Sequence, residues 1–240
     1  ESRRSFGGCN CGWVHFPSTN RLIRRQHAAM KRLSVGLVSL LAVAFALTAE
    51  ESSKKPVSIF DGKTFEGWEG DTDKMFRIED GAIVGGTLSE KIPHNAFLTS
   101  TKSYTDFVLR LKFKLLGEDP NAGVQIRSKR IPNHHEMIGY QADMGQNYWG
   151  CLYDESRRRK VLAQADLDLL KRIVKKDDWN TYEIRCEGKR IILKLNGEVT
   201  VDYTEPDDSI EQEGLIGLQI HSGAPSEAWY KEITIEDLAK

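Results

Sequence analysis

Residues 123–159 read GVQIRSKRIPNHHEMIGYQADMGQNYWGCLYDESRRR, and this stretch decides how the rest of the chain is interpreted. Successive side chains of a β-strand point to opposite faces of the sheet. In the first predicted strand, the apolar side chains at 124 and 126 therefore face a core, whereas Gln125 and Arg127 face away from it. In the second strand, Gln141 and Asp143 occupy the equivalent positions. Two neighbouring strands then present four hydrogen-bonding side chains on one surface, which is either a site or an ordinary solvated face.

A third strand, predicted over Gly214–His221, repeats this arrangement. Its apolar residues alternate with Gln219 and His221, and Gly217 leaves room beside them. A solvated face usually carries Lys, Glu and Thr. Gln, Arg, Asp and His instead offer directional hydrogen bonds and, for His, a proton that exchanges near neutral pH. The three strands together therefore favour a binding or catalytic surface.

The remaining sequence predicts further antiparallel strands that are closed by turns. Strict alternation over Phe107–Leu115 predicts a long strand with one buried and one wet face. Asp-Gly at 80–81 and Asn-Gly at 196–197 predict tight hairpins. The single helix candidate is Asp166–Val174, where leucines and Ile173 form a helical stripe. We therefore expect an all-β fold, an antiparallel β-sandwich or jelly roll with one short helix.

The first part of the chain predicts export. Met30 is followed by two basic residues, an apolar run over 33–47 and small residues, which is the pattern of a secretory signal peptide. The run is short for a membrane span, although a membrane anchor is the alternative. We expect an upstream extension (1–29), a signal peptide (30–49), a linker (50–56) and one working domain (57–240). The domain would then be periplasmic or extracellular.

The net charge of the predicted mature chain argues against two classes of partner. Seven of the 34 Lys and Arg residues precede residue 50, but only one of the 35 Asp and Glu residues does, so the remainder carries a formal charge of −7. An acidic exported domain is a poor binder of nucleic acid or of anionic membranes. Cys151 and Cys186 remain after cleavage, and the sequence leaves open whether they pair or are two buried thiols.

Short motifs in a fixed order give the chain a family resemblance. They are Phe60-Asp61-Gly62-Lys63-Thr64, Asn121-Ala122-Gly123-Val124-Gln125-Ile126-Arg127-Ser128, Gly139-Tyr140-Gln141-Ala142-Asp143, Gly150-Cys151-Leu152-Tyr153-Asp154-Glu155, Asp178-Trp179-Asn180-Thr181-Tyr182 and Leu218-Gln219-Ile220-His221-Ser222-Gly223. From about residue 57 to 238 the chain resembles the 3-keto-disaccharide hydrolase domain family. One departure is Ala122, where the family more often shows Ser. The resemblance implies a concanavalin-A-like lectin/glucanase sandwich, secreted by bacteria that degrade glycans.

The resemblance also implies a chemistry against which the residues can be tested. A keto group at C3 of a sugar acidifies the hydrogen on C2, so a base can remove it, the C1 substituent can leave, and water can add afterwards. Such a site needs a base, an acid for the leaving oxygen and an electrophile for the enolate. The candidate acids and bases are His221, Asp143, Glu136, His134 and His135.

Arg127 is the candidate that stabilises the enolate, unless it only forms an ion pair with Asp143. The resemblance implies no particular cofactor, and a divalent metal ion held by His134, His135 or Glu136 is the alternative electrophile. The candidate sugar-binding residues are Gln125, Gln141, Gln219, Tyr153, Trp149 and His135.

Three functions stay open at this point, all with carbohydrate as the partner. The first is a hydrolase or lyase of 3-keto-glycosides. The second is a non-catalytic carbohydrate-binding module on the same fold. The third is an ordinary glycosidase with two carboxylates, which is the weakest because the predicted face offers Asp143 without an obvious partner.

Overall fold

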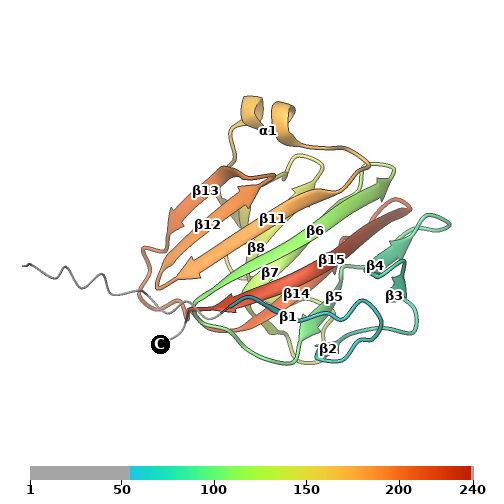
Figure 1. Cartoon of the computed structure of the whole chain (residues 1–240), viewed down its shortest axis with the longest axis horizontal. Helices are drawn as coiled ribbons and strands as arrows, with labels where there is room; N and C mark the ends of the chain where they lie inside the picture. Colours follow the sequence, from blue (N-terminus) through green and yellow to red (C-terminus); the bar gives the residue numbers. More distant parts are fainter. Residues whose placement is uncertain (1–54, 239–240) are drawn as a thin grey trace, which may run out of the picture. The chain divides into compact units, whose positions relative to one another are not determined.

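The computed structural model describes residues 55–238, which form two facing antiparallel sheets (Figure 1). The first sheet contains, in spatial order, β13 (Glu198–Thr204), β12 (Arg190–Leu195), β11 (Asn180–Glu187), β6 (Phe107–Gly117), β15 (Ser226–Asp237), β4 (Ala82–Thr87) and β3 (Phe76–Glu79), with β1 (Val57–Ser58) paired to β15. The second contains β10 (Lys160–Ala163), β9 (Leu152–Glu155), β8 (Met137–Gly145), β7 (Asn121–Arg130), β14 (Leu215–Ile220), β5 (Ala96–Ser100) and β2 (Trp68–Glu69). The predicted all-β sandwich is confirmed.

The predicted extension and signal peptide, residues 1–49, lie outside the described residues, as does most of the predicted linker. Among residues 55–238, no helix is both long enough and apolar enough to cross a membrane. Cys151 and Cys186 are both free thiols buried in the domain, which settles the question that the sequence left open.

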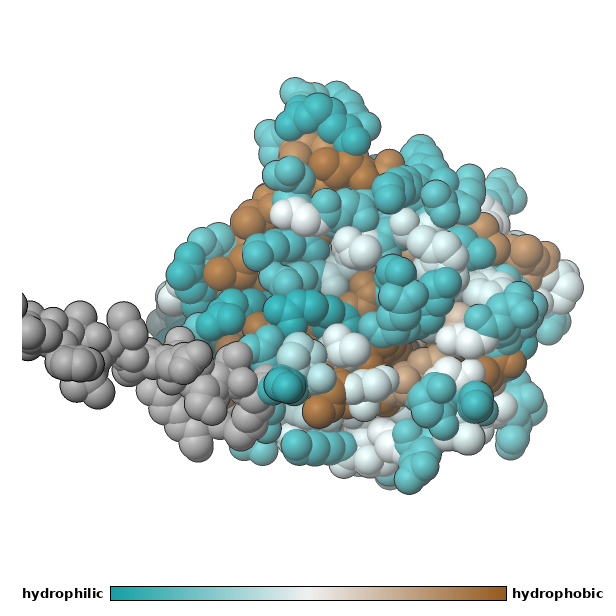
Figure 2. All heavy atoms as spheres, viewed as in Figure 1, coloured by the Kyte–Doolittle hydropathy of each residue, from teal (hydrophilic) through white to brown (hydrophobic). Residues whose placement is uncertain are grey.

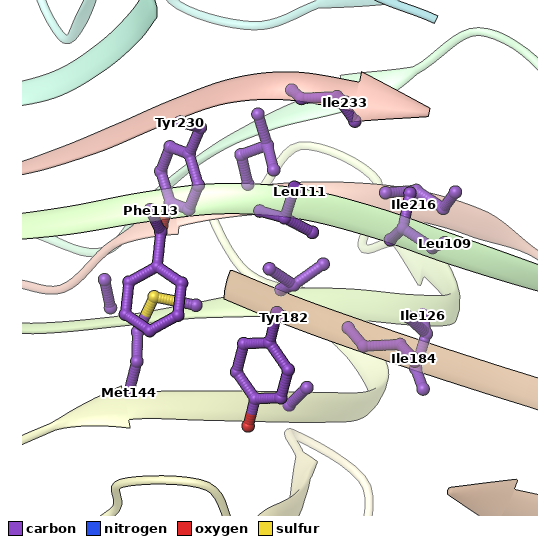
Figure 3. Close-up of a cluster of buried hydrophobic side chains, with 14 of the residues drawn as sticks. Leu109, Leu111, Phe113, Ile126, Met144, Tyr182, Ile184, Ile216, Tyr230 and Ile233 are labelled. Atoms are coloured by element: carbon purple, nitrogen blue, oxygen red, sulfur yellow. The ribbon is translucent and has the colours of Figure 1, made fainter. Parts of the chain in front are cut away.

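The core lies between the sheets and follows the alternation of the strands. On β6, the apolar residues of the alternating pattern, from Phe107 to Leu115, are at most 3% exposed. They meet apolar residues of β7, β8 and β14 such as Ile126, Met144 and Ile216 (Figure 3). Each such side chain contributes about 1.5–3 kcal/mol by leaving water, so this layer holds the sheets together.

The helix and the sharpest hairpin follow their local signals. Helix α1 (Leu167–Ile173) begins after Asp166, whose carboxylate accepts a hydrogen bond from the Leu169 backbone at 2.7 Å. Between β12 and β13, Asn196 and Gly197 have φ angles of +51° and +90°, as a two-residue hairpin turn requires. Both predictions are confirmed.

Two tyrosines of the first sheet cross the core and bond to the backbone of the second (Figure 3). Tyr182 on β11 donates to the carbonyl of Asp143 at 3.1 Å. Tyr230 on β15 donates to the carbonyl of Gln219 at 2.5 Å. Both rings are at most 1% exposed. The strands that carry the predicted polar surface are therefore held from beneath by hydroxyl groups.

A closed ionic cluster joins the ends of the two sheets near β9 and β13. Glu205 accepts hydrogen bonds from Tyr140 at 2.7 Å and from Arg158 at 2.6 Å. Arg158 and Arg157 also pair with Asp154, which is fully buried. Burial alone would raise the pKa of Glu205, but the bonds from Arg158 and Tyr140 outweigh it and lower that pKa to about 2. Every carboxylate of this cluster therefore has a cationic partner.

Candidate functional site

Four of the predicted polar residues come together on the face of the second sheet that points away from the core. Gln125 on β7 is paired with Gln141 on β8, and Gly123 lies between Asp143 on one side and Gln219 on the other. All four polar side chains are at most 4% exposed. The parity of the three strands therefore predicted this group correctly.

Hydrogen bonds link these side chains into one directed chain. The Ser128 hydroxyl donates to Gln125 at 2.5 Å, and the Gln125 amide donates to Gln141 at 2.7 Å. Gln141 then donates to Asp143 at 2.5 Å and to Gln219 at 3.3 Å. An amide that accepts at its oxygen and donates at its nitrogen has one orientation only, so the chain fixes the Asp143 carboxyl in place.

Gly123 is the position that lets the chain close. A Cβ at this residue would lie 2.6 Å from the side-chain carbons of Gln141, which real Cβ atoms do not tolerate. Any larger residue would displace Gln141, and with it the bond to Asp143. The glycine between Ala122 and Val124 therefore serves the site rather than a turn.

A pocket of about 260 Å³ opens above this layer. Its wall combines amides, carboxyl groups, phenols and one imidazole. The lining residues are Asn95, Asn121, Gln141, Asp143, Gln146, Tyr148, Tyr153, Glu155 and His221. Of the predicted site residues, the pocket thus brings together His221, Asp143, Gln141 and Tyr153, whereas Gln125 and Gln219 are buried in the layer behind it.

His221 follows β14 and is fixed at both its backbone and its ring. Its backbone N–H donates to the Asn121 carbonyl at 3.1 Å, and its Nδ1 lies 2.7 Å from the carbonyl oxygen of Ser222. Since a carbonyl can only accept, Nδ1 carries the hydrogen, and the neutral ring has its lone pair on Nε2. The ring is therefore oriented as a proton acceptor through Nε2.

Two carboxyl groups of the pocket hold their protons more tightly than usual. Burial raises the pKa of Asp143 well above its usual range, and the neighbouring Glu155 raises it further, against the lowering effect of the Gln141 bond. Burial also raises the pKa of Glu155 and the negative charge of Glu136 adds to this, against the hydrogen bonds that Ser156 donates. The pocket therefore contains two carboxyl groups with raised pKa values beside one imidazole.

Asn95 connects the pocket wall to Glu136. Its amide donates to the Glu136 carboxylate at 3.0 Å, and its carbonyl oxygen accepts the backbone N–H of Ser222 at 2.9 Å. The other carboxylate oxygen of Glu136 is buried without a hydrogen-bond partner in the described part of the chain. Glu136 therefore acts on the pocket through its charge and does not line it.

The predicted metal ligands are not arranged as a metal site. The rings of His134 and His135 stack at 4.4 Å, and the His134 Nδ1 accepts the backbone N–H of Glu136 at 3.1 Å. His135 Nε2 lies 3.6 Å from the Glu136 carboxylate. Within residues 55–238, no group of three or more His, Cys, Asp or Glu side chains is placed to hold a metal ion. The arrangement of these side chains therefore does not fit a bound metal ion.

The prediction that Arg127 belongs to the polar face was wrong. The pairing of β7 shifts after Ile126, and Arg127 has a φ angle of +48°, so its side chain leaves the face through a bulge. It is buried beside Asp106, to which it bonds at 2.9 Å, and it also donates to the Gln212 side chain at 2.6 Å. The alternative that Arg127 forms an ion pair is correct, but its partner is Asp106 instead of Asp143.

Trp149 does not line the pocket either. Its ring packs on Phe113, with the centroids 6.1 Å apart, and against the apolar core. Tyr148 instead contacts Tyr153 edge to face, with the centroids 6.1 Å apart. The two tyrosines form the aromatic part of the pocket.

Comparison with known protein families gives one match, to the family described as 3-keto-alpha-glucoside-1,2-lyase-like domain, over residues 55–236. The chain belongs to this family. Comparison with curated proteins gave no match.

Solved structures share the sandwich of this lyase-like domain at low sequence identity. A protein of Parabacteroides distasonis, provisionally assigned as a glycosyl hydrolase, is 20% identical with a TM-score of 0.59, covering 80% of this chain and 98% of its own. A carbohydrate-binding module from Bacillus subtilis is 16% identical with a TM-score of 0.56, covering 71% and 96%. A Bacillus subtilis protein with a galectin-like fold is 10% identical with a TM-score of 0.60, covering 77% and 97%. These likenesses establish the fold.

The sequence analysis of this lyase-like domain missed several pocket residues, of which Glu155 matters most. On β9, Tyr153 and Glu155 alternate with the buried Leu152 and Asp154, so the strand parity used for β7 and β8 would have found Glu155. Asn95 precedes a strand and Tyr148 lies in a loop, and neither position has a periodic signal.

Proposed function

We propose that this protein is a lyase of 3-keto-glycosides that removes the C2 proton, expels the C1 substituent and then adds water to the product. One observation carries the proposal. The pocket holds an imidazole with an open Nε2 and a carboxyl group with a raised pKa, both beside a rigid layer of amides. A proton acceptor and a proton donor are the two groups that this elimination needs.

In the first step, His221 Nε2 takes the proton from C2. The electron pair of the C2–H bond forms a double bond between C1 and C2, and the bond from C1 to the leaving oxygen breaks. Glu155, whose pKa is raised by burial and by the charge of Glu136, gives its proton to that oxygen. Charge that develops on the C3 oxygen is stabilised by N–H donors such as the Asn121 amide, of which one N–H bonds to Gln146.

In the second step, water adds across the C1=C2 bond, with hydroxyl to C1 and hydrogen to C2. The sum of the two steps is hydrolysis of the glycoside, without an oxidant or a reductant. The chain of amides holds the Asp143 carboxyl group in one orientation at the base of the pocket. The carbohydrate association of the family and of its structural neighbours supports a sugar as the ligand. Export of the protein to the periplasm or to the outside of the cell is part of this proposal.

A non-catalytic carbohydrate-binding module is the second candidate. The observation that favours it is the pair Tyr148 and Tyr153, which together with the pocket amides would bind a sugar ring without any proton transfer. An ordinary glycosidase, which needs two carboxyl groups, also gains support, because Glu155 lies in the pocket together with Asp143.

One experiment separates the three. Purified protein is incubated in D₂O with a 3-keto-α-glucoside and with the matching unoxidised glucoside, with a sample without protein to correct for spontaneous exchange. The proposal predicts release of 3-keto-glucose with deuterium at C2, and no release from the unoxidised sugar. Release without deuterium at C2 means direct hydrolysis. Cleavage of the unoxidised sugar identifies a glycosidase, and binding without any release identifies a binding module.

A further inference from the structure

A second hollow lies beside the pocket, separated from it only by the loop Gly145–Gly150. This groove has a volume of about 540 Å³ and runs between the loop and helix α1. Trp149, Leu170 and Val174 form its apolar lining, and Leu167 stands at its rim with 63% of its surface exposed. Apolar atoms are visible directly beneath α1 in Figure 2.

Gln146 connects the two hollows, because it lines both the pocket and the groove. Its side chain accepts a hydrogen bond from Asn121 at 3.0 Å and donates one to the Asp119 carbonyl at 3.0 Å. Asn121 is itself a pocket residue. The groove therefore begins where the pocket ends, at a side chain that both of them share.

The pocket is smaller and more polar than the groove, so the two hollows suit two chemically different parts of one ligand. Ligand sites are usually about 300–1,000 Å³. The pocket, at about 260 Å³, falls below this range and is lined by amides and carboxyl groups. A substrate larger than one sugar ring has room to extend past Gln146, where the lining becomes mainly apolar.

We propose that the groove between α1 and the loop Gly145–Gly150 binds the leaving group of the substrate, and that this group is an apolar ring, such as an aromatic alcohol. This inference rests on the proposed function, which places the sugar in the pocket. Trp149 supplies an aromatic ring, while Leu167 and Val174 supply aliphatic contacts. Gln146, Asn147, Gln164, Lys171 and Lys176 complete the lining, but most of its exposed surface is apolar, which favours an apolar ring over a second sugar.

The test compares methyl and benzyl 3-keto-α-glucosides, whose leaving alcohols have similar acidity, so that the bond-breaking steps are comparable. We expect a KM about tenfold lower for the benzyl substrate, the usual worth of one well-placed apolar group. Leu167→Asp should raise the KM of the benzyl substrate about fivefold and leave the methyl substrate within about twofold. Leu88→Asp is the matched control, since Leu88 is another exposed leucine, at 51%, and does not line the groove.

Equal KM values for the two substrates, or an equal effect of Leu167→Asp on both, would overturn the inference while the proposed function stands. A change of molecular mass by light scattering in Leu167→Asp, without a change of selectivity, would assign the groove to a second copy of the chain. If neither substrate is turned over, the proposed function fails, and saturation-transfer NMR of the benzyl ring protons decides. Transfer that Leu167→Asp abolishes supports the groove, and absence of transfer in the unaltered protein rejects it.

Discussion

Two adjacent residues of β9, Asp154 and Glu155, show how differently one strand uses its two faces. Asp154 points to the core side and is paired with Arg157 and Arg158. Glu155 points to the pocket, where its neighbours include the acids Glu136 and Asp143 and no arginine lines the wall. The closed ionic cluster lowers the pKa of its member Glu205 to about 2, whereas the pocket raises the pKa of Glu155.

The comparison shows how cationic partners change the pKa of a buried carboxyl group. A buried carboxylate with cationic partners stays ionised over the whole physiological range, so it stabilises the structure and exchanges no proton. A half-buried carboxyl group without such partners has a raised pKa, which favours the role of proton donor. The proposed function uses this difference, since no Lys or Arg of the described residues lines the pocket beside Glu155.

The largest effect is expected at the pocket acid and its imidazole neighbour. Glu155→Gln and His221→Ala should each lower turnover of a 3-keto-glucoside by about a hundredfold or more, the scale of general acid–base groups, with KM changed much less. Circular dichroism should show an unchanged fold, because neither side chain belongs to the core. Glu90→Gln, at an exposed position, is the control. Full turnover in either variant removes that residue from the mechanism.

The next effect falls on stability, at the closed cluster. Glu205→Gln removes the charge that Arg158 and Tyr140 hold, and should cost about 3 kcal/mol of the free energy of unfolding at neutral pH. Urea denaturation measures it. Turnover per folded molecule should stay the same, since Glu205 does not line the pocket.

The same variant has a pH dependence whose sign is fixed. Because the pKa of Glu205 is lowered from 4.5 to about 2 on folding, its stabilisation is complete above pH 4.5 and is lost as the pH falls towards 2. The unfolding curves of the unaltered protein and of Glu205→Gln should therefore converge on acidification. A gap that stays constant down to pH 2 would show that packing, and not charge, is lost in the variant.

The smallest effect is expected at Asp143. Its pKa is raised in the fold, so ionisation costs stability once the pH rises above its ordinary value of 3.8. Asp143→Asn should match the unaltered protein in acid, because the Asn oxygen still accepts the bond from Gln141, and should be the more stable of the two near neutrality. Thermal unfolding over a range of pH would detect this. A large loss at every pH would mean that the carboxylate itself holds the layer together.

Sequence reasoning found the parts of the site that obey strand periodicity. Gln125, Gln141 and Asp143 were placed correctly because both of their strands stay regular there. Arg127 was misplaced only two residues further on, since a bulge with a positive φ angle at an arginine has no composition signal. The fold was predictable almost throughout for the same reason, as the hairpin at 196–197 and the helix after Asp166 have strong local signals.

The rest of the site depends on contacts between distant segments. Asn95 reaches Glu136 and Ser222 across 41 and 127 residues of sequence, and no local pattern encodes such a meeting. Glu155 is different, because it alternates with buried residues along β9, so the face on which it lies could be predicted. In a strand next to one with a polar face, the same alternation therefore predicts further site residues.

Tyr182 and Tyr230 link the strands beneath the pocket to the opposite sheet. The carbonyl groups beneath Asp143 and Gln219 are bonded to hydroxyls that belong to the opposite sheet. The floor cannot open as a separate unit, because lifting β8 or β14 breaks bonds that cross the whole sandwich. Amide protons of these strands should then exchange with solvent only when the two sheets separate, so that the binding surface and the fold melt as one cooperative unit.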